Sequence, residues 1–257
     1  MESVRVLRAG LTPLKGARHA SLRAVTLDAQ GAVGDRTYCL VDVAAAKVLR
    51  TVQHPALTTM TASATDSGEL SVGLPDGRTL TDTPTATGGT LTCDYWGRPT
   101  PLDLLDGPHG ALLSELLGRP VTLARAPRRG VIYGAGVTLV TRASLEELAD
   151  RVGGSVDPAR FRATLVVDAD ESTPFIEDSW VGRDLTIGGV SLRIGAPVPR
   201  CAVIDIDPAT GERGSRLLTT LAGYRPLNDA GEPCFGVYAE VRAPGVVAVA
   251  EPTGGLP

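Results

Sequence analysis

Apolar positions along the chain alternate with polar ones or gather in short β-branched runs, and glycine, proline and aspartate separate these runs. Alternation with a period of two is typical of a strand buried on one face, and a short apolar run between turn residues suits a fully buried strand. The pattern predicts strands at Arg23–Leu27, Tyr38–Val43, Leu70–Gly73, Val137–Thr141, Thr164–Val167, Val190–Ile194, Ala202–Ile206 and Val237–Val241. Two dipeptides predict tight hairpin turns, namely Asp76-Gly77 and Gly188-Gly189.

Helical signals are few. They predict helices at Pro108–Leu117, which Gly118 closes, at Ser144–Val152, where Ser144 and Glu147 have capping-box spacing, and at Ser215–Tyr224. Many short strands with few helices favour a mostly β fold of the barrel or curled-sheet type, within the α+β class, over a doubly wound parallel sheet. The Pro/Arg/Gly stretch at Ala124–Gly130 predicts the break between two domains.

Composition and charge narrow the class of protein. Apolar residues make up 43% of the 257 residues, and aromatic residues only 4%, so we expect a packed core of valine, leucine, isoleucine and alanine. The net charge of −4 argues against nucleic-acid binding driven by bulk charge. No run reaches the roughly 18 apolar residues of a membrane span, and the first residues contain no apolar signal segment. We therefore expect a cytoplasmic protein without a membrane span.

The cysteines bear on cofactor chemistry. Cys39, Cys93, Cys201 and Cys234 are widely spaced and form no C-x-x-C pair. This spacing argues against a zinc knuckle, an iron–sulfur cluster and a secreted disulfide scaffold. The chain also contains no clear G-x-G-x-x-G unit, so a redox function would draw its electrons from a separate partner.

Several short segments, in order along the chain, resemble one known family. They are Pro13-Leu14-Lys15-Gly16, Gly34-Asp35-Arg36, Leu139-Val140-Thr141-Arg142-Ala143-Ser144-Leu145, Phe161-Arg162-Ala163-Thr164, Glu177-Asp178-Ser179-Trp180, Pro199-Arg200-Cys201, Asp207-Pro208-Ala209-Thr210-Gly211 and Phe235-Gly236-Val237-Tyr238. Each segment alone matches by chance, but their order and spacing cover nearly the whole chain. The chain resembles proteins with a molybdenum cofactor sulfurase C-terminal (MOSC) domain, specifically those related to the mitochondrial amidoxime reducing component.

The resemblance implies an architecture and a cofactor. It implies a MOSC N-terminal β-barrel domain, which we place at residues 1–124, followed by the MOSC domain at residues 125–257. It also implies a molybdenum–molybdopterin cofactor and, as partners, a small-molecule substrate and a separate electron donor, which would be a flavin protein, a ferredoxin or a b-type cytochrome.

Cys201 is the predicted metal ligand and a predicted catalytic residue. Members of the family place the molybdenum-ligating cysteine at this point, and a soft thiolate suits such a metal. The alternative is a small buried hydrophobe, since free cysteine is among the most buried residue types. Many relatives have a second cysteine three positions earlier, where this chain has Val198, so a dithiol mechanism is not expected.

Cationic and small polar residues complete the predicted cofactor site. The resemblance places Lys15, Arg36 and Arg162 near the cofactor, where arginine can clamp a phosphate and lysine acts as a point charge. The alternative is a solvated surface cation. We add Arg200, together with Gly16 and Thr164, two positions where relatives often have serine and asparagine.

Two further groups are predicted site residues with open alternatives. Thr141, Arg142 and Ala143 stand where a strand meets a helix, and a helix N-terminus can bind an anion such as a phosphate; ordinary capping is the alternative. The family pattern puts Asp178 near the metal, as a hydrogen-bond partner of the pterin or a proton donor to the substrate. A structural turn is the alternative.

Three functions remain open from the sequence. The first is a molybdenum oxidoreductase that reduces N-hydroxylated compounds or N-oxides. The second is a non-redox carrier of sulfur or of the cofactor, which uses Cys201. The third is a biosynthetic enzyme that reused the fold for other chemistry, because a fold does not determine a function.

Overall fold

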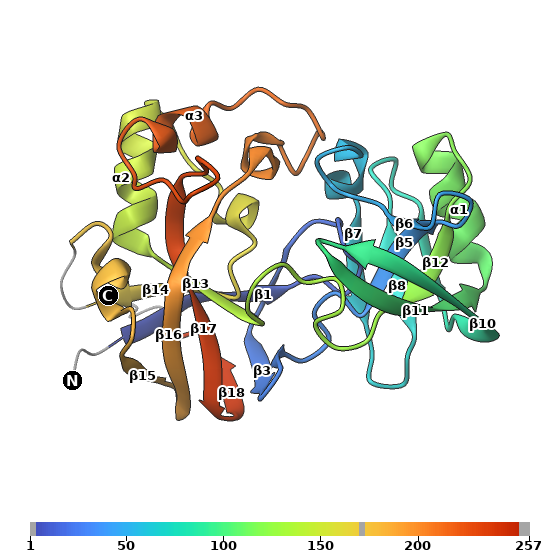
Figure 1. The fold of residues 1–257 in the computed structure, drawn as a ribbon, viewed down its shortest axis with the longest axis horizontal. Helices are drawn as coiled ribbons and strands as arrows, with labels where there is room; N and C mark the ends of the chain where they lie inside the picture. The colour runs from blue at the N-terminus through green and yellow to red at the C-terminus, as the bar shows by residue number, and fades with distance from the viewer. Residues whose placement is uncertain (1–3, 170–172, 252–257) are drawn as a thin grey trace, which may run out of the picture.

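The computed structural model describes residues 4–169 and 173–251, and within them strands dominate the regular structure, as predicted. Figure 1 shows two lobes side by side, with β13 to β17 in one lobe and β5 to β12 in the other. The strands of the described residues form four sheets, and in each of them the strand order is open and has two edges. Among the described residues, no helix combines the length and the apolar character that a membrane crossing requires.

The larger lobe is built on a seven-stranded sheet. Its strands, in spatial order, are β15 (Asp184–Ile187), β16 (Val190–Pro199), β17 (Cys234–Ala243), β13 (Val137–Thr141), β14 (Leu165–Ala169), β1 (Val4–Leu11) and β2 (Ala20–Leu22). Strands β13 and β14 are parallel, and helix α2 (Arg142–Val152) lies in the crossover that a parallel pair requires. A three-stranded sheet of β18 (Gly245–Ala248), β3 (Ala24–Asp28) and β4 (Gly31–Ala32) packs on it, with Val25, Leu27 and Val247 in the shared core.

The smaller lobe holds the other two sheets. One contains, in order, β10 (Thr85–Tyr95), β11 (Arg98–Asp106), β12 (Thr122–Arg125), β5 (Tyr38–Asp42) and β6 (Lys47–Val48), and the other contains β7 (Thr61–Ala64), β8 (Leu70–Gly73) and β9 (Thr79–Asp82). Helix α1 (Pro108–Leu117) begins at a proline and ends at Gly118, whose φ of 62° suits a helix C-terminus.

The remaining helical elements are short. In the part of the chain that the structure describes, they are α3 (Leu217–Ala222) and four 3₁₀ turns, η1 (Pro55–Thr59), η2 (Pro158–Phe161), η3 (Ile176–Trp180) and η4 (Ala202–Asp205). The predicted strand at Ala202–Ile206 is wrong, because this apolar run folds as η4. Ile204 packs into the core under α2 and α3. The Arg160 guanidinium donates to the carbonyl oxygen of Ile206 at 2.8 Å, so this backbone group is hydrogen-bonded without a neighbouring strand.

The chain passes between the lobes more than once. Strands β1 to β4 precede the smaller lobe in sequence, yet β1 pairs with β14 and β3 pairs with β18 in the larger lobe. Residues 126–136 lead back from β12 to β13. The division predicted between residues 124 and 125 stays a prediction, and it falls within β12, just before this return.

Candidate functional site

One cavity lies at the junction of the lobes, with a volume of about 200 Å³. This is less than the roughly 300–1,000 Å³ typical of small-molecule sites, so a ligand of cofactor size would extend from it to the surface. Its lining is cationic, and no aspartate or glutamate of the described ranges 4–169 and 173–251 belongs to it. Seven of the predicted site residues line it, namely Lys15, Gly16, Arg36, Arg162, Thr164, Arg200 and Cys201.

Cys201 lines this cavity. The residue follows the last residues of β16, whose pairing with β17 shifts register at Pro197 and Pro199, and it forms the N-terminal cap of η4. Cys201 is exposed, whereas Cys39, Cys93 and Cys234 are buried. The alternative of a buried small hydrophobe therefore does not describe Cys201.

Lys15 and Arg36 reach the cavity from two loops that run side by side. The backbone N–H of Lys15 donates to the carbonyl oxygen of Tyr38 at 2.8 Å, and that of Arg36 donates to Thr12 at 2.7 Å. Arg36 pairs with Asp35. The Nζ of half-buried Lys15 lies 5.4 Å from the centre of the Tyr95 ring. Burial, and then the nearby charges of Arg36 and Arg162, lower the pKa of Lys15 to about 7.

Arg162 links the larger lobe to the loop that carries Lys15. It ends η2 with a φ of 53°, in the left-handed region, and its Nη2 donates to the carbonyl oxygen of Ala17 at 2.8 Å. Burial, and then the neighbouring Arg36, lower the pKa of Arg162 to about 9. Cations that lower one another's pKa values repel each other, and an anion placed between them would relieve this repulsion.

Arg200 is the most buried cation of the cavity, with 7% of its surface exposed. Its Nε donates to the carbonyl oxygen of Phe235 and its Nη1 to that of Phe161, both at 2.8 Å. Its Nη2 is buried and has no hydrogen-bond partner among the described residues. Burial lowers the pKa of Arg200 to about 10. A buried guanidinium nitrogen without a partner is costly, so its place in a cavity wall is consistent with a ligand acceptor.

Gly16 and Thr164 serve the backbone geometry of the cavity. Gly16 has a φ of 98°, and a β-carbon there would lie 2.8 Å from Cδ1 of Leu57, so a serine at this position would be strained. Thr164 and Thr138 bond reciprocally, each backbone N–H to the other hydroxyl at 3.2 Å, and hold β13 against the start of β14.

The predicted residues at the start of α2 do not line the cavity. Thr141 caps the helix by accepting a hydrogen bond from the Ser144 N–H, so α2 starts two residues before the predicted Ser144. The buried carboxylate of Glu177 occupies this end of the helix and accepts from the Thr141 hydroxyl at 2.7 Å. Burial raises the pKa of Glu177. Arg142 is exposed and pairs with Asp168, and Ala143 follows it in the first helical turn.

Asp178 also lies outside the cavity lining. One of its carboxylate oxygens pairs with Nη2 of Arg225 at 2.5 Å, while its Oδ1 is buried and has no partner among the described residues. Arg225 in turn donates its Nε to the carbonyl oxygen of Cys234 at 2.9 Å. The observed contacts of Asp178 therefore join η3 to the start of β17.

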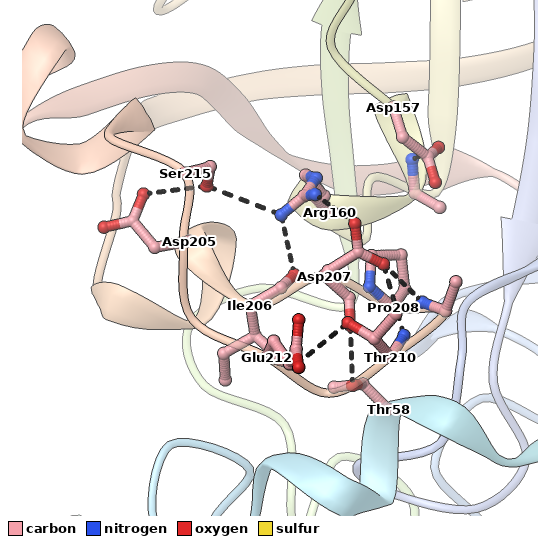
Figure 2. A network of polar contacts seen from close by, with 12 residues as sticks. Thr58, Asp157, Arg160, Asp205, Ile206, Asp207, Pro208, Thr210, Glu212 and Ser215 are labelled. Atoms are coloured by element: carbon pink, nitrogen blue, oxygen red, sulfur yellow. Dashed lines mark hydrogen bonds and ion pairs between the residues drawn. The ribbon is translucent and has the colours of Figure 1, made fainter.

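The cavity also contains residues that sequence reasoning missed, among them Tyr95, Tyr133, Thr138, Arg160 and Tyr238. Figure 2 shows how Arg160 is held: its guanidinium donates to the carbonyl oxygen of Ile206 at 2.8 Å and to the carboxylate of Asp207 at 2.9 Å. Arg160 stands two residues before the predicted Arg162, and this cationic pair was the signal available in the sequence.

Two family models match consecutive parts of this chain. Residues 4–120 match the model of the MOSC N-terminal beta barrel domain, and residues 127–253 match the model of the MOSC domain. The chain therefore belongs to the family of MOSC proteins.

Two relatives illustrate the degree of similarity. The molybdenum cofactor sulfurase of Caenorhabditis elegans is 27% identical over 88% of this chain and 32% of its own length. The mitochondrial amidoxime-reducing component 1 of Homo sapiens is 31% identical over 44% of this chain and 35% of its own length. The chain thus spans about a third of the length of these curated relatives. The YuaD protein of Bacillus subtilis aligns in structure over 97% of this chain and 94% of its own, with a TM-score of 0.43 and 10% identity, which is too distant to support an argument.

The donor set of the cavity fits the cofactor that this family implies. Within the described residues, no three His, Cys, Asp or Glu side chains gather as a metal site. A single exposed thiol therefore suits a metal whose other ligands arrive with an organic group, and an anionic group suits the cations around it. Arg200, a residue of the cavity lining with a partnerless Nη2, is consistent with such a group.

Proposed function

We propose that this chain binds a molybdenum–molybdopterin cofactor in the Cys201 cavity and reduces N-hydroxylated compounds or N-oxides. One observation supports the proposal above all: an exposed thiol shares a cavity with Lys15, Arg36, Arg162 and Arg200, and no carboxylate of the described residues lines it. The Cys201 thiolate would be the metal ligand. The relatives named amidoxime-reducing components support the choice of substrate class.

The residues of the chain would bind and orient the cofactor. Arg36, Arg162 and Arg200 would hold its anionic part, with Lys15 as a further charge, while Gly16 and Thr164 keep the backbone close. When bound, the cofactor supplies the two-electron redox chemistry. The overall reaction takes the N-oxygenated compound, two electrons and two protons to the deoxygenated compound and water. We expect the electrons to come from a separate protein, namely a flavin protein, a ferredoxin or a b-type cytochrome.

Metal analysis tests the binding part of the proposal. Freshly purified wild type should contain molybdenum and pterin, and Cys201→Ala should lose most of the metal while it folds normally. Cys93→Ala is the matched control, because Cys93 is buried on β10 and does not line the cavity. Equal metal in both variants, or no metal in carefully prepared wild type, would rule out Cys201 as the ligand.

Turnover tests the reaction. Wild type that carries molybdenum should reduce benzamidoxime to benzamidine under anaerobic conditions with dithionite-reduced methyl viologen as the donor. Loaded protein without turnover of amidoximes, hydroxylamines or N-oxides would contradict the reductase proposal and leave cofactor binding intact.

A carrier function is the second candidate. Cys201 is exposed, the other three cysteines are buried, and the relative aligned over 88% of the chain is named a molybdenum cofactor sulfurase. An exposed thiol can hold a persulfide, and the cysteine across the strand pairing, Cys234, is buried with a raised pKa, which disfavours the thiolate that would resolve it. Mass spectrometry of Cys201 discriminates the two candidates: a persulfide without stoichiometric molybdenum supports the carrier.

A further inference from the structure

Two exposed aromatic rings meet beside the Cys201 cavity, and one of them, Tyr133, belongs to its lining. Tyr133 lines the cavity and is 50% exposed, and Trp96 is 53% exposed. Their ring centres lie 5.2 Å apart in an edge-to-face arrangement. Contiguous exposed apolar surface marks binding sites, and here Trp96 extends the aromatic surface of a residue that lines the proposed active site.

Trp96 occupies a backbone position that disfavours a bulky residue. It joins β10 to β11 through a two-residue turn in which Trp96 has a φ of 56° and Gly97 a φ of 76°. Such a turn favours asparagine or glycine at the first position, because both adopt positive φ readily. A tryptophan at this position is strained, and strained residues concentrate at functional sites.

Neighbouring contacts hold the two rings in place. The Arg50 guanidinium stacks 4.3 Å from the centre of the Trp96 ring. Arg98, which follows the turn, donates from Nη2 to the carbonyl oxygen of Ile132 at 2.6 Å, and the Thr100 hydroxyl donates to Gly130 at 3.3 Å. The segment that carries Tyr133 is therefore tied to the hairpin that carries Trp96.

We propose that Trp96 and Tyr133 form a subsite that binds the flat aromatic part of an N-oxygenated substrate, so that its N–O group points into the Cys201 cavity. The inference deepens the proposed function and rests on it for the identity of the substrate. A flat ring stacks on tryptophan and tyrosine at little cost in conformational entropy. The subsite selects aromatic over small aliphatic substrates.

The direct test measures binding without turnover. Trp180 is buried, so the difference in emission between wild type and Trp96→Phe reports on Trp96. Benzamidoxime should change this difference emission in a saturable way, and acetamidoxime, with the same reacting group but no ring, should not. Equal responses to both compounds, or no response to either, would overturn the subsite.

Steady-state kinetics form the second test. Trp96→Asn should raise the KM for benzamidoxime by about five- to tenfold, the range expected for loss of one aromatic contact, and leave the KM for acetamidoxime unchanged. Tyr133→Ala should act in the same direction, and Trp96→Phe should retain most of the affinity. Leu227→Ala is the control, because Leu227 is an exposed apolar residue outside the cavity lining.

Stability and cofactor content separate a binding role from a structural one. Asparagine suits the turn, so Trp96→Asn should unfold at the same temperature as wild type or a higher one, and its molybdenum and pterin contents should not change. A lower Tm or a loss of pterin would overturn the proposal, since the ring would then serve the fold or the cofactor. If wild type reduces neither amidoxime but benzamidoxime still changes the Trp96 emission, the reductase proposal fails and the aromatic subsite stands.

Discussion

Lys15 is the residue whose charge the cavity alters within the physiological pH range. Its pKa near 7, against 10.5 in a solvated lysine, follows from burial beside Arg36 and Arg162. A bound anion would favour the protonated form, so binding above pH 7 requires the uptake of a proton. The cavity should therefore hold anions more tightly at low pH than at high pH.

Sulfate tests this expectation, because its own charge stays constant over the range. In cofactor-free protein, sulfate affinity measured by calorimetry should fall between pH 6 and pH 9, by up to about tenfold per pH unit. Lys15→Met should bind sulfate with little dependence on pH. Lys47→Met is the matched control, since Lys47 is exposed on β6 and does not line the cavity. The same slope in Lys15→Met and wild type would refute a role for Lys15.

The same pKa bears on stability. Lys15 is protonated up to about pH 10.5 in the unfolded chain but only up to about pH 7 in the folded chain. Between these two values the unfolded chain binds more protons, so the free energy of unfolding decreases as the pH falls from 10.5 to 7. Wild type should therefore lose stability relative to Lys15→Met over this interval. Urea unfolding at pH 7 and pH 10 measures the difference, and a difference that does not change with pH would contradict the lowered pKa.

At the scale of elements, the N-terminus of helix α2 is capped by side chains of the protein itself. Thr141 caps the helix, and Glu177, from η3, accepts from the hydroxyls of Thr141 and Ser144 at 2.7 and 2.9 Å. An internal carboxylate thus lies where an external anion would otherwise be attracted. This arrangement favours a structural function for the start of α2.

Removal of the cap should cost stability but little anion binding. Thr141→Ala should lower the free energy of unfolding by about 1–2 kcal/mol, since it removes an N-cap and a donor to a buried carboxylate. Arg142→Ala should change it by less than about 1 kcal/mol, because exposed ion pairs contribute little. Denaturant titration compares the two variants. A large loss of sulfate affinity in either variant would instead support an anion site at this helix.

At the scale of the whole molecule, the cavity depends on how the two lobes meet. Arg162 crosses from the larger lobe to Ala17, and Arg18 donates from Nε and Nη2 to the carbonyl oxygen of Pro208 at 3.0 and 2.7 Å. Next to Pro208, the carbonyl oxygen of Asp207 accepts a hydrogen bond from the Thr58 hydroxyl of η1 at 3.5 Å (Figure 2). These contacts set the positions of cations that come from distant parts of the chain.

Arg18→Ala tests this junction. Loss of two charged hydrogen bonds to one carbonyl should lower the free energy of unfolding by about 1–3 kcal/mol and should also weaken sulfate binding, although Arg18 does not line the cavity. Arg23→Ala provides the control, because Arg23 is exposed next to β3. Unchanged sulfate affinity in Arg18→Ala would show that the junction does not position the cations.

Local signals in the sequence predicted several elements correctly. The helix at Pro108–Leu117 and the strands at Leu70–Gly73 and Val137–Thr141 are confirmed with their predicted bounds, since turn residues and periodicity define both ends. The Gly188-Gly189 turn is confirmed, with φ values of 57° and 85°. Ala202–Ile206 was wrongly predicted as a strand. Periodicity does not distinguish a strand from an apolar run whose backbone carbonyl is hydrogen-bonded by a distant side chain, here Arg160.

The sequence by itself determined the strand-rich character of the chain, both ends of the helix at Pro108–Leu117 and, through the order of its motifs, the family. Only the tertiary structure decided which predicted residues share that cavity and which, like Thr141 and Asp178, bond elsewhere. It alone brought Trp96 against Tyr133 and Glu177 to the start of α2. The physical reason is that local backbone preferences act over a few residues, whereas burial, charge and hydrogen bonding depend on side chains far away in the chain.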